Sequence, residues 1–141
     1  MSLALAPFGL RSARKRGSGA NSTGLSRYSI NPLGFNGNIF SGDSVNILNT
    51  GYLVPTSAAS TNTLGAFMGC VYNDPTTKRP TWSQYYPANT SVGTDPAGIS
   101  AFVNDDPNQT FLVQAGASVS AGDVMAYNFA LSLGAGSTTT G

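Results

Sequence analysis

The pattern of hydrophobic and polar positions is clearest between residues 65 and 87. Two runs rich in aromatic and β-branched residues, 65–72 and 81–86, enclose the polar stretch 73–80, which contains two prolines. This arrangement is typical of a long β-hairpin. We therefore expect this hairpin to be the centre of the fold.

Alternation along the first strand of this hairpin predicts two distinct faces, because successive side chains point to opposite sides of a sheet. One predicted face carries Leu64, Ala66, Met68, Cys70 and Tyr72, and the other carries Phe67 and Val71 with Gly65 and Gly69. Glycines within a strand mark a bulge or the close approach of another backbone. Such a feature is therefore expected in this strand.

Further short strands are predicted at 27–30, 45–48, 52–54, 99–103 and 110–115. The second and third of these enclose Asn49-Thr50-Gly51, which predicts a tight hairpin. The last two enclose 104–108 and predict a second clear hairpin. In 124–131 apolar residues have helical spacing, and a helical turn and a strand are both left open there.

The composition favours an all-β fold, in the form of a small β-barrel or β-sandwich with little helix. The chain has 141 residues, which suggests one domain, and 17 Gly and 8 Pro indicate many turns. All six acidic residues are Asp, so the strong helix former Glu is absent. There is no His, so the usual general base and the commonest metal ligand are missing as well.

Charge is divided unevenly along the chain. Residues 1–27 contain five basic residues and no acid, whereas 28–141 contain two basic residues against six Asp. The sequence therefore predicts a basic arm at 1–26, a β-rich body at 27–133 and a flexible Gly/Ser/Thr tail at 134–141. An open tail and a shortened sequence are both left open for the last segment.

The arm at 1–26 shows neither helical nor strand periodicity, and we expect it to be disordered until it binds a partner surface. A tail without any function is the alternative. Apolar anchors and a cationic patch are the candidate docking residues: Leu3, Leu5, Phe8, Leu10, Arg11, Arg14, Lys15, Arg16 and Arg27. Nucleic acid is not the expected partner, since no aromatic residues are interleaved with these charges and the body is acidic.

Catalysis and a bound cofactor are not expected. Asp105 and Asp106 precede Pro107 and are interpreted as turn residues, with a calcium site as the weaker alternative. One cysteine without histidine argues against zinc, and Cys70 is expected to be a small buried hydrophobic residue. No apolar run is long enough to span a membrane, and the order of apolar and basic residues at the start is not that of a signal peptide.

Four aromatic residues of the main hairpin allow two interpretations. Tyr72, Trp82, Tyr85 and Tyr86 either form a platform that stacks on sugars or fill the core and its rim. The structural interpretation is favoured. A receptor- or glycan-binding role is kept as the alternative function.

Several phrases together resemble a family of small tailed-phage virion proteins, the capsid decoration, cement or head-stabilising proteins. They are Ala6-Pro-Phe-Gly-Leu-Arg11, Ile39-Phe-Ser-Gly-Asp43, Gly69-Cys-Val-Tyr72, Pro80-Thr-Trp82, Tyr86-Pro87 and Asn104-Asp-Asp-Pro107. The resemblance covers about 6–130. It implies a β-tulip-like body, no catalytic residues, and relatives that continue past the Gly/Ser/Thr stretch into another strand-forming segment.

The resemblance further implies a structural protein on the outer surface of the virion capsid, assembled in the host cytoplasm. Its implied partners are the major capsid protein and neighbouring copies of itself, as a homotrimer. Nucleic acid, a membrane, metals and cofactors are not expected. A basic arm repeated at symmetric sites would bind strongly through effective concentration, which agrees with this role.

Overall fold

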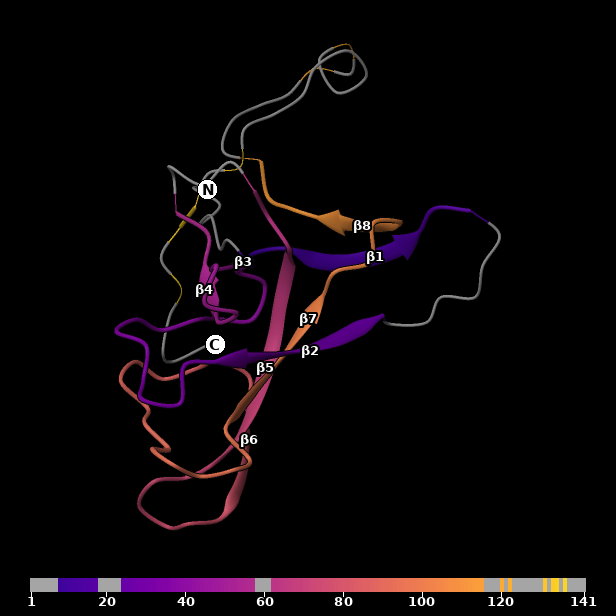
Figure 1. The fold of residues 1–141 in the computed structure, drawn as a ribbon. Helices are drawn as coiled ribbons and strands as arrows, with labels where there is room; N and C mark the ends of the chain where they lie inside the picture. Colours follow the sequence, from indigo (N-terminus) through magenta and orange to yellow (C-terminus); the bar gives the residue numbers. More distant parts are fainter. Residues whose placement is uncertain are drawn as a thin grey trace.

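The computed structural model describes residues 8–17, 24–57 and 62–115, together with six single positions between 120 and 136. Within the described residues all eight elements are β-strands, arranged in two antiparallel sheets (Figure 1). The all-β prediction is confirmed. Residues 124–130 lie outside the described residues, so the two alternatives proposed for that segment are not tested.

The strands are β1 Arg11–Lys15, β2 Leu25–Ile30, β3 Ser44–Ile47, β4 Leu53–Pro55, β5 Gly65–Asn73, β6 Pro80–Ser83, β7 Ile99–Asn104 and β8 Gln109–Leu112. The larger sheet has six strands in the order β2-β7-β5-β3-β4, with β6 also paired to β5. The smaller sheet consists of β1 and β8. Both short-range hairpins that the turn residues indicate, β3–β4 and β5–β6, are confirmed.

Strand β5 is the centre of the larger sheet. Strand β7 pairs along one edge from Ala66 to Tyr72. On the other edge, β3 pairs with Gly65 and Ala66, and β6 pairs with the segment from Cys70 to Asn73. One long strand therefore holds three neighbours and fixes the register of the whole sheet.

The hydrophobic core lies on one face of this sheet. Its members are Ile30, Ile39, Val45, Leu53, Phe67, Cys70, Tyr72, Tyr86, Ile99, Ala101 and Val103, all of them buried. Strand β7 contributes the alternate residues Ile99, Ala101 and Val103, as its pattern predicts. Burial of these side chains from several strands is the main source of stability for such a domain.

The predicted faces of β5 are wrong before residue 68, because the strand contains a bulge there, whereas Cys70 and Tyr72 share one face as predicted. The pairing with β7 passes from Phe67 opposite Val103 to Gly69 opposite Phe102, so Met68 is an extra residue. The extra residue shifts the alternation by one, and Phe67 therefore shares the core with Cys70 and Tyr72. The expectation that a glycine marks a bulge is confirmed at Gly69.

The larger sheet curls but does not form a closed barrel. At the two ends of its strand order, Ser29 of β2 and Tyr52, the residue before β4, form a single parallel bridge. One bridge does not make a continuous ladder between these edges. The curl nevertheless encloses Ile30 and Leu53 completely from solvent.

The second predicted hairpin is wrong in its pairing. Strands β7 and β8 are both present, but β8 does not pair with β7. The reason is that β2 and β5 already occupy both edges of β7. Strand β8 instead leaves the larger sheet and pairs with β1.

The expectation that the whole segment 1–26 is disordered is also wrong. Arg11–Lys15 forms β1, and Leu25 and Ser26 belong to β2, which crosses the predicted boundary at residue 27. Disorder was expected because ordering this segment costs conformational entropy. The hydrogen bonds between β1 and β8 offset that cost. Residues 1–7 and 18–23 lie outside the described residues.

Candidate partner-docking interface

Strands β1 and β8 form a two-stranded ribbon that lies across one end of the larger sheet (Figure 1). The register places Ser12 opposite Phe111 and Lys15 opposite Gln109, with an irregularity between Ser12 and Arg14. These four paired residues are all half-buried. They form the inner face of the ribbon, directed at the body.

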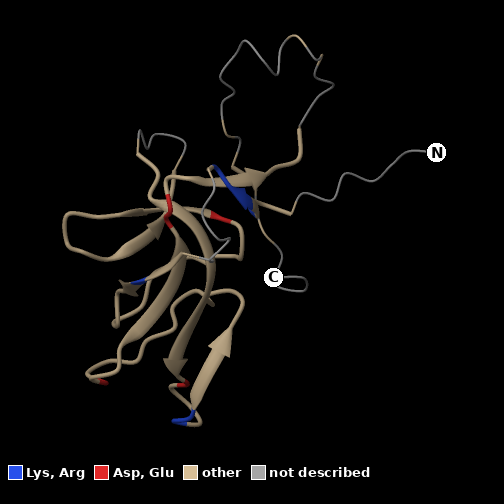
Figure 2. Cartoon of the chain, turned by 90° about the vertical axis from the view of Figure 1, so that its right-hand side faces the viewer, with Lys and Arg blue, Asp and Glu red and all other residues tan. Residues whose placement is uncertain are grey.

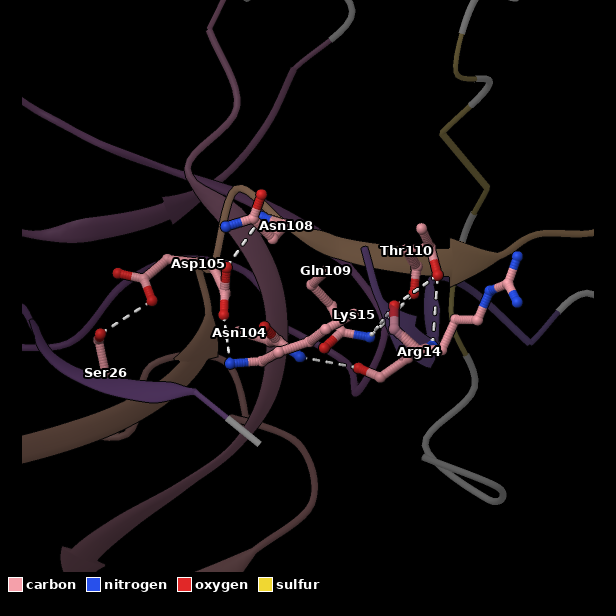
Figure 3. A network of polar contacts seen from close by, with 10 residues as sticks. Arg14, Lys15, Ser26, Asn104, Asp105, Asn108, Gln109 and Thr110 are labelled. Atoms are coloured by element: carbon pink, nitrogen blue, oxygen red, sulfur yellow. Dashed lines mark hydrogen bonds and ion pairs between the residues drawn. The ribbon is translucent and has the colours of Figure 1, made fainter. Parts of the chain in front are cut away.

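The inner face is held to the body by polar contacts (Figure 3). The side-chain amide of Asn104 donates a hydrogen bond of 2.9 Å to the Ser12 hydroxyl. Lys15 forms an ion pair with Asp106. The hydrogen bond from Lys15, together with one from the Asn108 backbone N–H, lowers the pKa of the Asp106 carboxyl below its ordinary value.

Asp105 connects the turn after β7 to strand β2. It accepts hydrogen bonds from the Ser26 hydroxyl at 2.8 Å and from the Tyr28 hydroxyl at 2.6 Å. Asp105 and Asp106 therefore act as structural turn residues. Within the part of the chain that the structure describes, no three His, Cys, Asp or Glu residues cluster as a metal site would require.

The segment that leads into β1 docks on the body backbone to backbone. The Leu10 N–H donates a hydrogen bond of 2.8 Å to the Gly42 carbonyl oxygen. A Cβ atom on Gly42 would lie 3.0 Å from the Phe8 carbonyl oxygen, and one on Gly9 would lie 2.8 Å from the Gly42 oxygen. This close approach requires glycine on both sides, and both glycines have positive φ.

The outer face of the ribbon is cationic. Arg11 and Arg14 are exposed on β1, and the neighbouring Arg16 is exposed directly after it. None of the three has an acidic partner within ion-pair distance among the described residues. Figure 2 shows the basic stretch of β1 as a blue strand at the upper end of the body.

The structure places the remaining predicted docking residues in different surroundings. Phe8 is half exposed and Leu10 is partly buried against Gly42. Arg27 is not part of the ribbon, because it belongs to β2 and its guanidinium carbon lies 5.2 Å from the centre of the Phe102 ring. Leu3 and Leu5 lie outside the described residues.

The four aromatic residues of the main hairpin do not form a common platform. Tyr72 and Tyr86 are buried in the core, as the structural interpretation expects. Tyr85 stacks against Phe40 with ring centres 5.7 Å apart. Trp82 alone remains 54% exposed.

Sequence reasoning missed several residues that hold the interface or border it. Neither Ser12 nor Asn104 could be recognised from the sequence pattern, because the hydrogen bond between them joins residues that are 92 positions apart. Phe102 did give a signal, since it is the one large aromatic residue on the outward side of β7. Cys70 is buried as predicted, and burial raises the pKa of its thiol to about 12, so it is not a reactive nucleophile.

In comparisons with known proteins, no family model matches the chain, and neither a curated protein nor a solved structure matches it. Among the described residues, no helix has the length and apolar character needed to cross a membrane. The resemblance to capsid decoration proteins therefore stays a prediction.

Proposed function

We propose that this chain is a structural, non-catalytic protein that binds the outer surface of an icosahedral phage capsid and bridges its subunits. Its partners are the major capsid protein and neighbouring copies of itself, arranged as a homotrimer. The family resemblance suggests this setting, and the ribbon of β1 and β8 supplies the docking surface. The chain acts there without metal or cofactor.

The observation that carries the proposal is the two-faced ribbon. Its inner face is half-buried against the body, whereas its outer face presents Arg11 and Arg14. Exposed Leu112 lies opposite Arg11 on the neighbouring strand. Arginine is enriched among the residues that dominate the energy of protein interfaces, and an exposed leucine beside it adds apolar area that a partner can bury.

The edges of the ribbon supply further binding capacity. Within the described residues β1 pairs with β8 alone, so each strand keeps one edge whose N–H and C=O groups have no strand partner. Such an edge can add a strand from another chain, and the arginines favour an acidic one. Strand β1 is already paired with β8 in the chain by itself, and the proposed docking surface differs in that respect from the disordered arm that the sequence suggested.

The test is to reverse the outer charges of the ribbon. The double variant R11E/R14E should lower occupancy on shells assembled from the major capsid protein of the same virus by about tenfold or more, because like charges then face each other. Occupancy is measured by co-sedimentation followed by quantitative gel densitometry. Binding of the unaltered chain should also weaken between about 50 mM and 500 mM salt.

The matched control is K78E/R79E, which reverses two exposed charges in the β5–β6 turn and changes the net charge equally. This control should bind shells nearly as well as the unaltered chain. Equal occupancy of the R11E/R14E variant and the control would contradict the proposal. A circular dichroism spectrum of each variant establishes that the β-fold is retained.

A further inference from the structure

Within the part of the chain that the structure describes, the outer face of the larger sheet, opposite the core, is only partly covered. The ribbon covers one end of it, where Ser12 contacts Asn104 of β7. Beyond that end, β2, β7, β5 and β6 direct alternate side chains away from the core. The outward side chains that matter here are Arg27, Ser29, Val71, Trp82, Ser100 and Phe102.

Two of these residues form a fixed aromatic surface. The Trp82 and Phe102 rings lie with centres 5.4 Å apart and planes inclined by 52°. Gly69 lies between them, and a Cβ atom there would come within 2.7 Å of the Trp82 ring. The bulge at Gly69 and its missing side chain thus allow the indole to lie on the sheet and reach Phe102.

The polar groups that border this aromatic surface form neither an ion pair nor a side-chain hydrogen bond with any other described residue. Arg27 lies over Phe102, and within the described residues it forms no ion pair. Ser29 and Ser100 are opposite each other in the register of β2 and β7. Neither hydroxyl forms a hydrogen bond with another described residue.

We propose that this face binds an acidic saccharide, that is, a chain of pyranose rings bearing carboxylates. The apolar face of a ring stacks on the exposed indole of Trp82, which Phe102 supports from the side, because an aromatic surface attracts C–H groups as well as cations. The sugar carboxylate pairs with Arg27 by a charge-assisted hydrogen bond. The Ser29 and Ser100 hydroxyls bind sugar hydroxyl groups.

The same features disfavour the other occupants of such a face. An apolar protein surface would bury the two serine hydroxyls and the guanidinium without partners, which is unfavourable. A nucleic-acid strand needs a row of cations along its backbone, whereas Arg27 is the single cation among these outward residues. Neighbouring strands lie about 4.8 Å apart, so the four strands span about 14 Å, which suits an oligosaccharide better than a single sugar.

The experiment measures binding of the full chain to polygalacturonate and to a sialylated oligosaccharide, with dextran as the neutral comparison, by affinity electrophoresis and calorimetry. The unaltered chain should bind at least one acidic probe. W82A should weaken that binding by about tenfold, since it removes the stacking surface. R27Q should weaken it by about fivefold or more and should leave any dextran binding unchanged.

The matched control is R79Q, which removes a different exposed arginine and should bind the acidic probes as the unaltered chain does. R27Q changes one exposed side chain, so it remains informative if W82A fails to fold. Absence of binding to both acidic probes, or binding that survives R27Q and W82A, would overturn the proposal. Loss of shell occupancy in these two variants without any saccharide binding would assign the face to a protein partner instead.

This proposal and the docking function fail independently. The R11E/R14E variant alters the ribbon and leaves Arg27, Trp82 and Phe102 in place, so it should still bind the acidic probe. Conversely, W82A should still bind shells. The R11E/R14E variant therefore tests the ribbon, whereas R27Q and W82A test the outer face of the larger sheet.

Discussion

The six-stranded body and the two-stranded ribbon of this chain are stabilised in different ways. In the body, β5 holds three neighbouring strands, and eleven residues form a buried core. The ribbon has no such core, and two-stranded sheets alone are marginally stable in water. It is held by the pairing of β1 with β8, by the Lys15–Asp106 ion pair and by a close backbone contact at Gly42.

This difference implies that the ribbon can open while the body remains folded. Apolar burial is cooperative and resists local loss, whereas a few polar contacts at the surface contribute little free energy each. If the ribbon is the docking surface proposed above, it can therefore adjust to its partner without unfolding of the body. The three predictions that follow test this separation, beginning with the largest expected effect.

The largest effect is expected from Phe67→Ala in the body. Phe67 is completely buried in the core, and its truncation should lower the free energy of unfolding by about 3–5 kcal/mol because it leaves a cavity. The matched control is Phe8→Ala, at a half-exposed site next to the ribbon, which should change the free energy by less than about 0.5 kcal/mol. Urea denaturation measures the free energy of unfolding of both variants. Equal losses would mean that side chains of the body and of the ribbon region contribute alike to stability.

A smaller effect, confined to the ribbon end of the molecule, is expected from Gly42→Ala. The new methyl group would collide with the backbone of Phe8 and Leu10 and should displace the segment that leads into β1. Gly51→Ala is the control, because Gly51 has a similar positive φ but no atom within 4 Å of the added methyl group. Both variants should lose about 1–2 kcal/mol through backbone strain.

Hydrogen exchange of the Leu10 amide distinguishes these two variants. It should become fast in Gly42→Ala and stay slow in Gly51→Ala, since only the first substitution removes the hydrogen bond from Leu10 to the Gly42 carbonyl. Slow exchange in both variants would show that the segment docks by other contacts.

The smallest effect is expected from acid. The pKa of Asp106 is lowered by its hydrogen bond with Lys15, so this contact stabilises the ribbon above the pKa of the unfolded state and is lost as the pH falls below about 4. After correction for intrinsic rates, exchange of the Arg16 amide, which bonds to the Asn108 carbonyl, should rise by up to about fivefold.

Two comparisons make the acid experiment specific. Asp106→Asn should show the faster exchange already at neutral pH, with no further acid effect on the Arg16 amide. Asp95→Asn alters a carboxyl of the body whose pKa is also lowered, in that case by Asn73, and should leave the ribbon unchanged. An acid response that persists in Asp106→Asn would assign the effect to another group.

Local pattern predicted those parts of the fold that depend on neighbouring residues. The β5–β6 hairpin and the tight turn at Gly51 follow from alternation and turn chemistry, and both are present. The partner of β8 could not be found in this way, because it depends on which edges of β7 are already occupied. Strand β1 could not be predicted either, because its contacts to the body are polar and its sequence therefore shows no alternation of apolar residues.

The candidate sites were predicted only in part. The basic residues of β1 were identified from the sequence, but their division into an inward Lys15 and outward Arg11 and Arg14 depends on the pairing with β8. Trp82 was identified as well. Arg27 was identified only as part of the basic arm. The contact of Trp82 with Phe102 could not be predicted, because it joins strands β6 and β7 across the bulged β5 that lies between them.

The pairing of β1 with β8 also bears on how the chain is made. Arg14 and Thr110 are hydrogen-bonded although 96 positions separate them. At the usual pace of translation, β1 waits roughly 5 to 20 s before its partner has been synthesised. During that time the charged side chains of β1 disfavour pairing with nascent strands of other molecules, because charges on an unpaired strand oppose edge-to-edge aggregation.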